Sequence, residues 1–376
     1  MKMKMKSIFM LAIGLAMAWI YVACSKDENL TPSIKFIRIT DLNSSDSLLS
    51  AAYQASTIAI IGDNLANARE VWFNDLKASL TPTYITNTSI ITTVPSDVPK
   101  VVTNTMTVVF GDGYRLEYPF SIVVSKPEVR SMGCEFVSVG NTATLRGKYF
   151  YEPLTVKFTG GATGVIKSVK DDLIEVTVPS GALSGPVTVT TNFGETISDF
   201  WFRDTRNIFV SSDPFTGWWN PSYVVTNPSE GDPASINGNY IRLNKIVGAW
   251  AWTEVVGGPA SAMGAISKNI PDDAIMNPED YNFKFEINTK KPYTSNLIKF
   301  NIGINSENND AYKWEPPYDT KGEWQTVVIP FEEIAAKQPL AETPNPNGYW
   351  ARILMHGPGE LDADISFDNL RIVPKK

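Results

Sequence analysis

The feature that most constrains the fold of this chain is an internal repeat in its first half. Residues 57–65 and 142–150 each contain a strand-like apolar run that includes a glycine. A Thr-Val-Pro-Ser stretch at 93–96 recurs at 177–180. The copies are offset by about 81 to 85 residues, which is the length of a compact Ig-like sandwich. The repeat therefore predicts two small β-domains in tandem.

The remainder of the chain also has the pattern of β-structure. Short runs of Val, Ile, Thr and Phe alternate with Gly, Pro, Asn and Asp, without a long apolar stripe of helical period after the N-terminal segment. From about residue 203 the composition shifts, and seven of the ten tryptophans lie beyond that point. Short strands and Pro- and Gly-rich loops are typical of a jelly roll. The predicted fold class is all-β, with two tandem Ig-like sandwiches followed by a jelly-roll-like β-sandwich.

The N-terminus has the pattern of an export signal. Lysines at positions 2, 4 and 6 precede an apolar run over residues 8–23 that ends at Cys24. Small residues before this cysteine resemble a bacterial lipobox, although Tyr21 stands where Leu is usual. The resemblance implies that Cys24 is lipidated, with palmitate among its acyl chains; the alternative is a secretory signal with an incidental cysteine. The short acidic stretch at 25–29, just after this cysteine, resembles the surface-export signal of Bacteroidetes lipoproteins.

Composition excludes several classes of chemistry. The net charge of -7 argues against nucleic acid as a partner, because phosphate contacts need clustered Lys and Arg. One histidine, His356, and two cysteines cannot build multi-histidine metal sites, cysteine-rich zinc sites or a disulfide framework. We expect neither a cofactor nor a metal, while a structural calcium stays an open question. Cys134 lies between apolar residues and is expected to be a buried, inert thiol.

The strongest candidate for a binding surface lies around Trp250. In an extended strand, Trp250, Trp252 and Glu254 share one face, and the opposite face carries small apolar residues. Two exposed indoles beside a carboxylate would suit an oligosaccharide, because sugar rings stack their C–H faces on indoles while polar groups bind the hydroxyls. The alternative is that both indoles lie in the core, where tryptophan is mostly found.

Further aromatic residues suggest a more extended surface. Adjacent indoles cannot both face one core, and an extended segment places alternate aromatic side chains on one side. Several exposed aromatics together imply a ligand. The additional candidates for glycan contact are Trp218, Trp219, Tyr312, Trp314 and Trp350. Trp324, in a Gly-x-Trp-x-Thr strand, is expected to pack as a structural residue.

An enzyme is the main alternative to a binding protein. A glycosidase needs two carboxylates about 5 to 10 Å apart across a cleft. Glu254 and Glu315 each adjoin tryptophans and are the natural pair. A third possibility is an adhesin that binds a protein partner through the same aromatics. Non-catalytic binding remains the leading interpretation.

The order of the short strands and Val-Pro ends resembles the IPT/TIG family of Ig-like domains. Together with the lipidated cysteine and the tryptophan-rich end, the whole chain is similar to the surface glycan-binding lipoproteins of Bacteroidetes polysaccharide-utilisation loci, the SGBP-B-like proteins. The implied divisions are a signal peptide at 1–23, a lipidated tether at 24–31, Ig-like domains at 32–125 and 126–202, and a glycan-binding sandwich at 203–376.

The same resemblance implies a function. The C-terminal domain would bind a plant or fungal β-glucan, such as xyloglucan or mixed-linkage glucan, through an aromatic platform. The implied location is the outer membrane, lipid-anchored and outward-facing. The implied partners are a SusC/SusD-like transporter and a surface glycanase. Which polysaccharide is bound, which tryptophans are exposed and the oligomeric state are not determined at this level.

Overall fold

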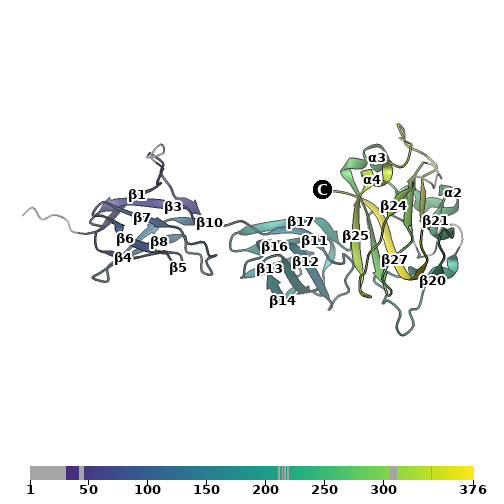
Figure 1. Cartoon of the computed structure of the whole chain (residues 1–376), viewed down its shortest axis with the longest axis horizontal. Coiled ribbons are helices and arrows are strands. Elements are labelled where there is room, and N and C mark those ends of the chain that lie inside the picture. Colours follow the sequence, from purple (N-terminus) through teal and green to yellow (C-terminus); the bar gives the residue numbers. More distant parts are fainter. Residues whose placement is uncertain are drawn as a thin grey trace, which may run out of the picture. The chain divides into compact units, whose positions relative to one another are not determined.

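The computed structural model describes residues 31–41, 46–210, 212–213, 215, 217, 220–304, 311–339 and 341–376. The chain divides into two compact units, one ending at Val124 and one beginning at Ser125. The predicted all-β class is confirmed, with sheets in each unit (Figure 1). No helix among the described residues is long and apolar enough to cross a membrane.

The first unit is a sandwich of two four-stranded sheets. Ile60 and Val71, on facing sheets, are buried in its core. One sheet has the order β1 (Ser33–Ile39), β3 (Thr57–Asp63), β7 (Ser89–Thr93), β6 (Leu80–Ile85). The other has the order β5 (Leu76–Lys77), β4 (Ala68–Phe73), β8 (Thr105–Phe110), β9 (Arg115–Pro119). A short parallel pair joins β2 (Ala51–Tyr53) to β10 (Ser121–Val123).

The second unit begins with another sandwich of the same kind. Its core contains Leu145, Val156 and Val189. The first sheet has the order β11 (Glu128–Met132), β12 (Thr142–Lys148), β15 (Leu173–Thr177), β14 (Val165–Lys170). The second has the order β13 (Leu154–Thr159), β16 (Leu183–Thr191), β17 (Gly194–Phe202). We call this sandwich the second Ig-like domain.

The repeated glycine has the same structural cause in both copies. Gly62 on β3 lies opposite a bulge in β1, and a Cβ there would collide with the carbonyl oxygen of Ser33. Gly147 on β12 lies opposite a bulge in β11, where the obstacle is the carbonyl oxygen of Glu128. Close approach of two backbones admits only glycine, so the sequence repeat records a repeated bulge.

The C-terminal domain packs two sheets against each other. The first consists of β19 (Val224–Val225), β20 (Tyr240–Val247), β27 (Leu361–Pro374), β22 (Tyr281–Thr289) and β25 (Gln325–Pro330), with β18 (Ile208–Val210) pairing β27. The second has the order β21 (Thr253–Gly258), β26 (Trp350–Met355), β23 (Ile298–Gly303), β24 (Tyr312–Trp314). Short helices connect the strands: η2 (Pro221–Tyr223), α2 (Ala260–Met263), η3 (Gly264–Asn269), α3 (Asp272–Met276), η4 (Pro278–Asp280) and α4 (Phe331–Ala335).

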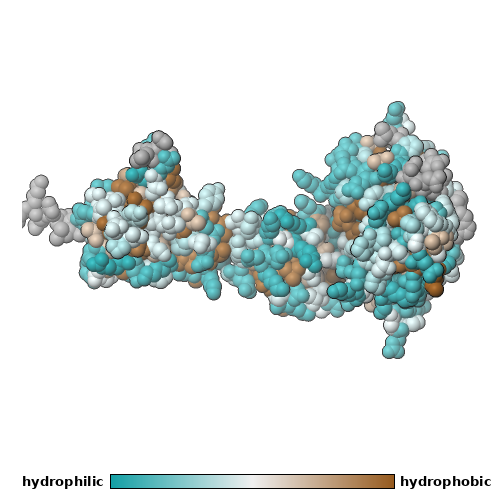
Figure 2. Space-filling view, in the orientation of Figure 1, coloured by the Kyte–Doolittle hydropathy of each residue, from teal (hydrophilic) through white to brown (hydrophobic). Residues whose placement is uncertain are grey.

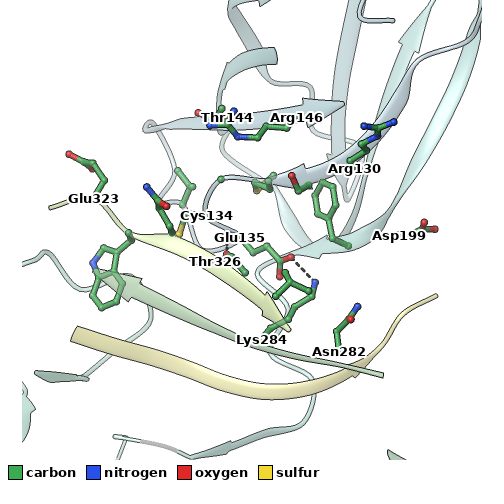
Figure 3. Close-up of a pocket in the computed structure, with 18 of the residues that line it drawn as sticks. Arg130, Cys134, Glu135, Thr144, Arg146, Asp199, Asn282, Lys284, Glu323 and Thr326 are labelled. Atoms are coloured by element: carbon green, nitrogen blue, oxygen red, sulfur yellow. Dashed lines mark hydrogen bonds and ion pairs between the residues drawn. The ribbon is translucent and has the colours of Figure 1, made fainter. Parts of the chain in front are cut away.

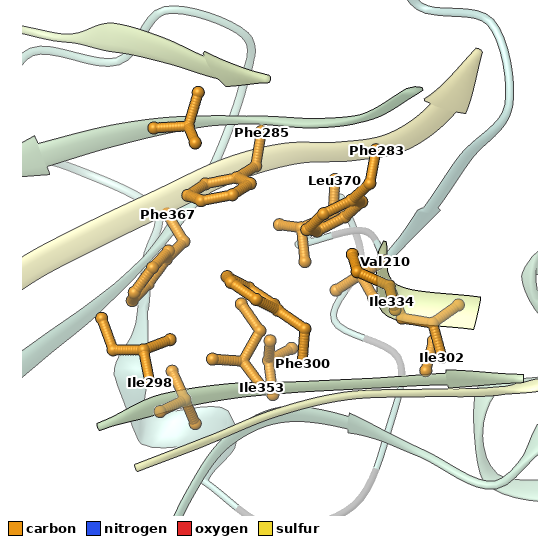
Figure 4. Close-up of a cluster of buried hydrophobic side chains, with 14 of the residues drawn as sticks. Val210, Phe283, Phe285, Ile298, Phe300, Ile302, Ile334, Ile353, Phe367 and Leu370 are labelled. Carbon is orange, nitrogen blue, oxygen red and sulfur yellow. The ribbon is translucent and has the colours of Figure 1, made fainter. Parts of the chain in front are cut away.

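A cluster of phenylalanines fills the space between these sheets (Figure 4). The ring of Phe300, on the second sheet, lies 5.0 Å from that of Phe283 and 5.1 Å from that of Phe285 on the first. Each buried aromatic side chain contributes about 1.5–3 kcal/mol to the stability of the domain. This core fixes the second sheet, and thereby the side chains on its outer face. Apolar residues on the surface drawn in Figure 2 form small scattered patches.

Buried charges join the second Ig-like domain to the C-terminal domain. Glu135, in the loop after β11, accepts a bond from Lys284 Nζ at 2.7 Å (Figure 3). It accepts a second bond from Arg371 Nη2 at 2.6 Å. Arg371 also donates to Glu286, with Nη1 lying 2.8 Å from Oε2. Two cations thus face two carboxylates, and the Arg371 side chain is wholly buried. Burial raises the pKa of Glu286, and Arg371 opposes that shift.

Backbone contacts fix the same junction. The amide of Thr326 donates to the carbonyl of Gly133 at 2.9 Å. The amide of Glu135 donates to the Thr326 hydroxyl at 2.8 Å, and that hydroxyl donates to Glu286. The free Cys134 thiol lies beside these groups and is buried, and its burial raises its pKa. The prediction of a buried, inert thiol is therefore confirmed. A groove of about 580 Å³ opens next to this junction (Figure 3).

We expect Glu135→Gln to destabilise the second unit by about 3–5 kcal/mol, because it leaves two buried cations with one carboxylate. Glu128→Gln is the matched control, since its pair with Arg130 is about half exposed and exposed pairs contribute about 0–1 kcal/mol. Denaturant titration of both variants measures the difference. Equal effects would show that the buried network does not stabilise this junction.

Candidate functional site

Trp250 and Trp252 project from the turn that precedes β21. Their exposed fractions are 60% and 49%, so the alternative in which both indoles lie in the core is wrong. The predicted reason is also wrong, because Trp250 is not in a strand. It has a left-handed backbone with φ of 59°, and its amide donates to the carbonyl of Gly357 at 2.8 Å. A tight turn, rather than strand alternation, carries both indoles outward.

His356 lies between the two indoles. Its ring centre is 5.5 Å from that of Trp250 and 5.2 Å from that of Trp252. The amide of His356 donates to the carbonyl of Leu297 at 3.0 Å, which anchors the residue at the end of β26. We call Trp250, Trp252 and His356 the indole platform. Sequence analysis did not assign His356 to it.

Glu254 and Arg352 contact Trp252 and hold its indole in place. The Trp252 indole Nε1 donates to Glu254 Oε1 at 2.9 Å, and Arg352 Nη1 donates to the same oxygen at 2.8 Å. The Arg352 guanidinium lies 5.8 Å from the centre of the Trp252 ring. Burial raises the pKa of Glu254, partly offset by Arg352, and lowers that of Arg352. The carboxylate therefore orients Trp252, whose side chain stays about half exposed at 49%.

A groove of about 320 Å³ adjoins the platform. Its lining includes Lys245, Trp252 and Glu254. Asn220 and Tyr223 complete the wall, and the Asn220 amide donates to the backbone carbonyl of Glu254 at 2.6 Å. Amide, phenol and ammonium groups beside an indole can donate to and accept from sugar hydroxyls.

Trp350 connects to the platform through Arg352. The two residues share a face of β26, as predicted from the alternation of side chains. The Arg352 guanidinium lies 5.4 Å from the centre of the half-buried Trp350 ring. One guanidinium therefore contacts both Trp252 and Trp350.

Tyr312 and Trp314 lie on the opposite side of that sheet. Both pack against the core, and the Trp314 ring lies 4.9 Å from Tyr318 and 5.7 Å from Phe285. The structure therefore does not bring them to the platform. Sequence analysis identified their shared face but assigned it to solvent, although alternation with charged Lys313 already pointed to a core-facing pair.

The remaining candidates have varied positions. Trp218 and Trp219 lie outside the described residues, as does Cys24. Trp324 is half-buried, with its ring 5.5 Å from Tyr240 and its Nε1 donating to the carbonyl of Ala234 at 2.8 Å, and it also lines the groove beside the junction; its structural role stays a prediction. Glu315 is exposed at the end of β24. Among the described residues, no group of three or more His, Cys, Asp or Glu is arranged to hold a metal ion.

Comparison with known proteins reveals relatives of the whole architecture. Residues 202–374 match the model of the surface glycan-binding protein B xyloglucan-binding domain. An IPT/TIG domain-containing protein of Bacteroides ovatus is 22% identical, with alignment over 94% of this chain and 95% of that protein.

Two solved structures share the fold. Surface glycan-binding protein PbSGBP-B of Prevotella bryantii aligns with a TM-score of 0.69 at 22% identity, covering 92% of this chain and 99% of that one. A structure solved with a xylogluco-oligosaccharide aligns with a TM-score of 0.51 at 17% identity, again covering 92% and 99%.

We expect His356 to be neutral at pH 7, because burial and the nearby Lys299 lower its pKa below the usual 6.5. As the chain has a single histidine, an NMR titration of the imidazole reads this pKa without assignment. The unfolded chain takes up the proton at higher pH than the folded chain, so the stability contributed by neutral His356 falls as pH drops below about 6.5. His356→Gln should flatten the decline of Tm between about pH 7 and pH 5. A titration midpoint at or above 6.5 would refute this.

Proposed function

We propose that this SGBP-B-like chain binds a β-glucan polysaccharide without cleaving it, through the indole platform. The observation that carries the proposal is the pair of solvent-exposed indoles of Trp250 and Trp252 in the turn that precedes β21. Exposed indoles cost stability in water unless they serve an interaction. His356 contacts both indole rings, so the two indoles offer neighbouring apolar surfaces to successive sugar rings.

Preorganisation supports a binding role. Trp252 is held by Glu254, which is in turn held by Arg352. A side chain fixed before the ligand arrives loses little conformational freedom on binding, so more of the stacking energy appears as affinity. Glu254 accepts hydrogen bonds from both Trp252 and Arg352 on one oxygen, and it thereby orients the indole.

The class of ligand is inferred from the relatives. The domain model matching residues 202–374 is named for xyloglucan, and one structure of the same fold was solved with a xylogluco-oligosaccharide. These names favour xyloglucan or another β-glucan, such as mixed-linkage glucan, for this chain. Extended β-linked chains present flat ring faces that suit stacking on neighbouring indoles.

We further propose that the chain acts at the cell surface. Cys24 would carry the lipid anchor in the outer membrane, with the platform facing outward. There it would capture polymer for a surface glycanase and a SusC/SusD-like transporter. Many anchored copies on one polymer would raise the effective affinity well above that of one site.

We expect Trp252→Ala to weaken binding of xylogluco-oligosaccharides by about 10- to 100-fold, since a buried aromatic contact contributes about 1.5–3 kcal/mol. Trp250→Ala should act in the same direction. Isothermal titration calorimetry measures the loss, and thermal unfolding checks that the domain remains folded.

The matched control for these variants is Trp72→Ala. Trp72 is a half-exposed tryptophan of the first unit whose Nε1 also donates to a glutamate, Glu70, at 2.8 Å. Its loss should leave binding unchanged. Wild-type affinity in both platform variants would place the site elsewhere, and release of reducing sugar by the wild-type chain would indicate an enzyme.

The anchor has a separate test. We expect Cys24→Ala to move the chain from the membrane fraction to the soluble fraction of the bacterium and to abolish metabolic labelling with palmitate, because the modified thiol is lost. Cys134→Ala is the control, because that thiol is buried within the fold. Unchanged labelling and fractionation of Cys24→Ala would contradict lipidation at this residue.

A further inference from the structure

Two lysines face each other on the outer side of the second sheet. Lys299 on β23 and Lys313 on β24 are direct partners in the antiparallel register. Their strand neighbours Ile298, Phe300 and Trp314 pack against the core, so the lysine side chains project from the opposite side, which is that of Arg352 and Trp350. Like charges directly opposite each other destabilise a sheet.

Neither lysine has a carboxylate partner among the described residues. Lys299 is only 5% exposed, and its ammonium contacts the Nδ1 atom of His356 at 3.2 Å. Lys313 is exposed, and Glu315, the residue after β24, forms no ion pair with either lysine within the described ranges. A largely buried ammonium without an anion is costly. The lowered pKa of Lys299, due to burial and then to Lys313, reflects this cost.

These charges adjoin the indole platform. His356, which contacts Lys299, also contacts both indoles. A third lysine, the exposed Lys245, lines the groove beside Trp252. Glu254, which lines the same groove, is already bonded to Arg352. The chain as a whole carries a net charge of -7, so this local excess of cations does not follow from composition.

We propose that the indole platform, besides neutral β-glucan, binds glycan that carries a carboxylate, as a uronic acid does, and prefers it because Lys299 and Lys313 bind the acid. This inference rests on the proposed glycan-binding function of the platform. Stacking on the indoles recognises the ring, and the paired ammonium groups recognise the acid. A neutral sugar needs hydrogen-bond donors but does not offset two adjacent positive charges.

The donors available to the acid follow from His356. Neutral imidazole accepts one N–H of the Lys299 ammonium at Nδ1, which leaves two N–H groups for a ligand. Lys313 offers three more from the exposed edge of the sheet. Ammonium-to-carboxylate bonds are stronger than bonds to hydroxyls, so a carboxylate at this position resolves the repulsion that the free protein retains.

The test compares each acidic oligosaccharide with its neutral counterpart. The probes are β-gluco-oligosaccharides oxidised to carboxylates at C6 and glucuronic acid-substituted xylo-oligosaccharides, each paired with its unoxidised or carboxyl-reduced form. We expect at least one acidic probe to bind about tenfold tighter than its counterpart at low salt. Raising the salt from ~0.05 to ~0.5 M should shrink that ratio.

Variants connect this preference to the lysines. Lys313→Gln and Lys299→Met should each abolish the preference, measured as the ratio of the affinities for the acidic probe and its neutral counterpart. Lys170→Gln is the matched control, removing an exposed lysine from β14 of the second Ig-like domain, and should retain the preference. Lys313 is exposed, so its variant remains informative if Lys299→Met fails to fold.

The outcomes separate the two proposals. Equal binding of acidic and neutral probes, independent of salt, would overturn the inference and leave the proposed glycan-binding function standing. A preference that persists in both lysine variants would also overturn it. Failure of every acidic and neutral probe, together with xyloglucan and mixed-linkage glucan, would overturn both.

Discussion

The second unit depends on one buried group of charges. Arg371 is enclosed between Glu286 of its own domain and Glu135 of the second Ig-like domain. Lys284 also pairs with Glu135, so that two positive charges face two negative ones. Removing charges from water is costly, and good geometry with full pairing offsets that cost. The amide of Thr326 and the carbonyl of Gly133 join the backbones of the two domains at the same place. The face that carries the platform is thereby held at a set orientation to the second Ig-like domain.

The candidate site also uses a pair of opposite charges to hold neighbouring side chains in place. Glu254 links Trp252 to Arg352, and Arg352 links Trp252 to Trp350, so aromatic surface is held in place by a charge behind it. The phenylalanine core on the inner face of the same sheet keeps the strands in register (Figure 4). What distinguishes the outer face is that its remaining cations, Lys299 and Lys313, are not paired within the described residues. A surface both aromatic and positively charged suits a sugar polymer that bears acid groups.

Sequence reasoning succeeded where a local pattern has a local cause. Gly62 and Gly147 lie opposite equivalent bulges in the neighbouring strands, so the repeat was a reliable guide to the fold. Trp350 and Arg352 share a face because alternation holds within a regular strand. Sequence reasoning failed for Tyr312 and Trp314, which pack against the edge of the core. It also failed for the backbone of Trp250, because a left-handed turn does not follow the alternation of a strand. His356 was recognised only as the single histidine, and nothing in its neighbours along the chain indicated that it contacts two indoles.

The sequence by itself determined the all-β class, the duplicated Ig-like domain and the concentration of tryptophan in the last domain, because propensity, turn residues and repeats are properties of neighbouring residues. The tertiary structure alone decided which aromatics face the solvent and which charges are paired. Glu254 meets Arg352 across 98 residues of sequence, and Glu135 meets Arg371 across 236. Such contacts depend on strand register and on which domain covers which face, and no periodicity along the chain encodes either of them.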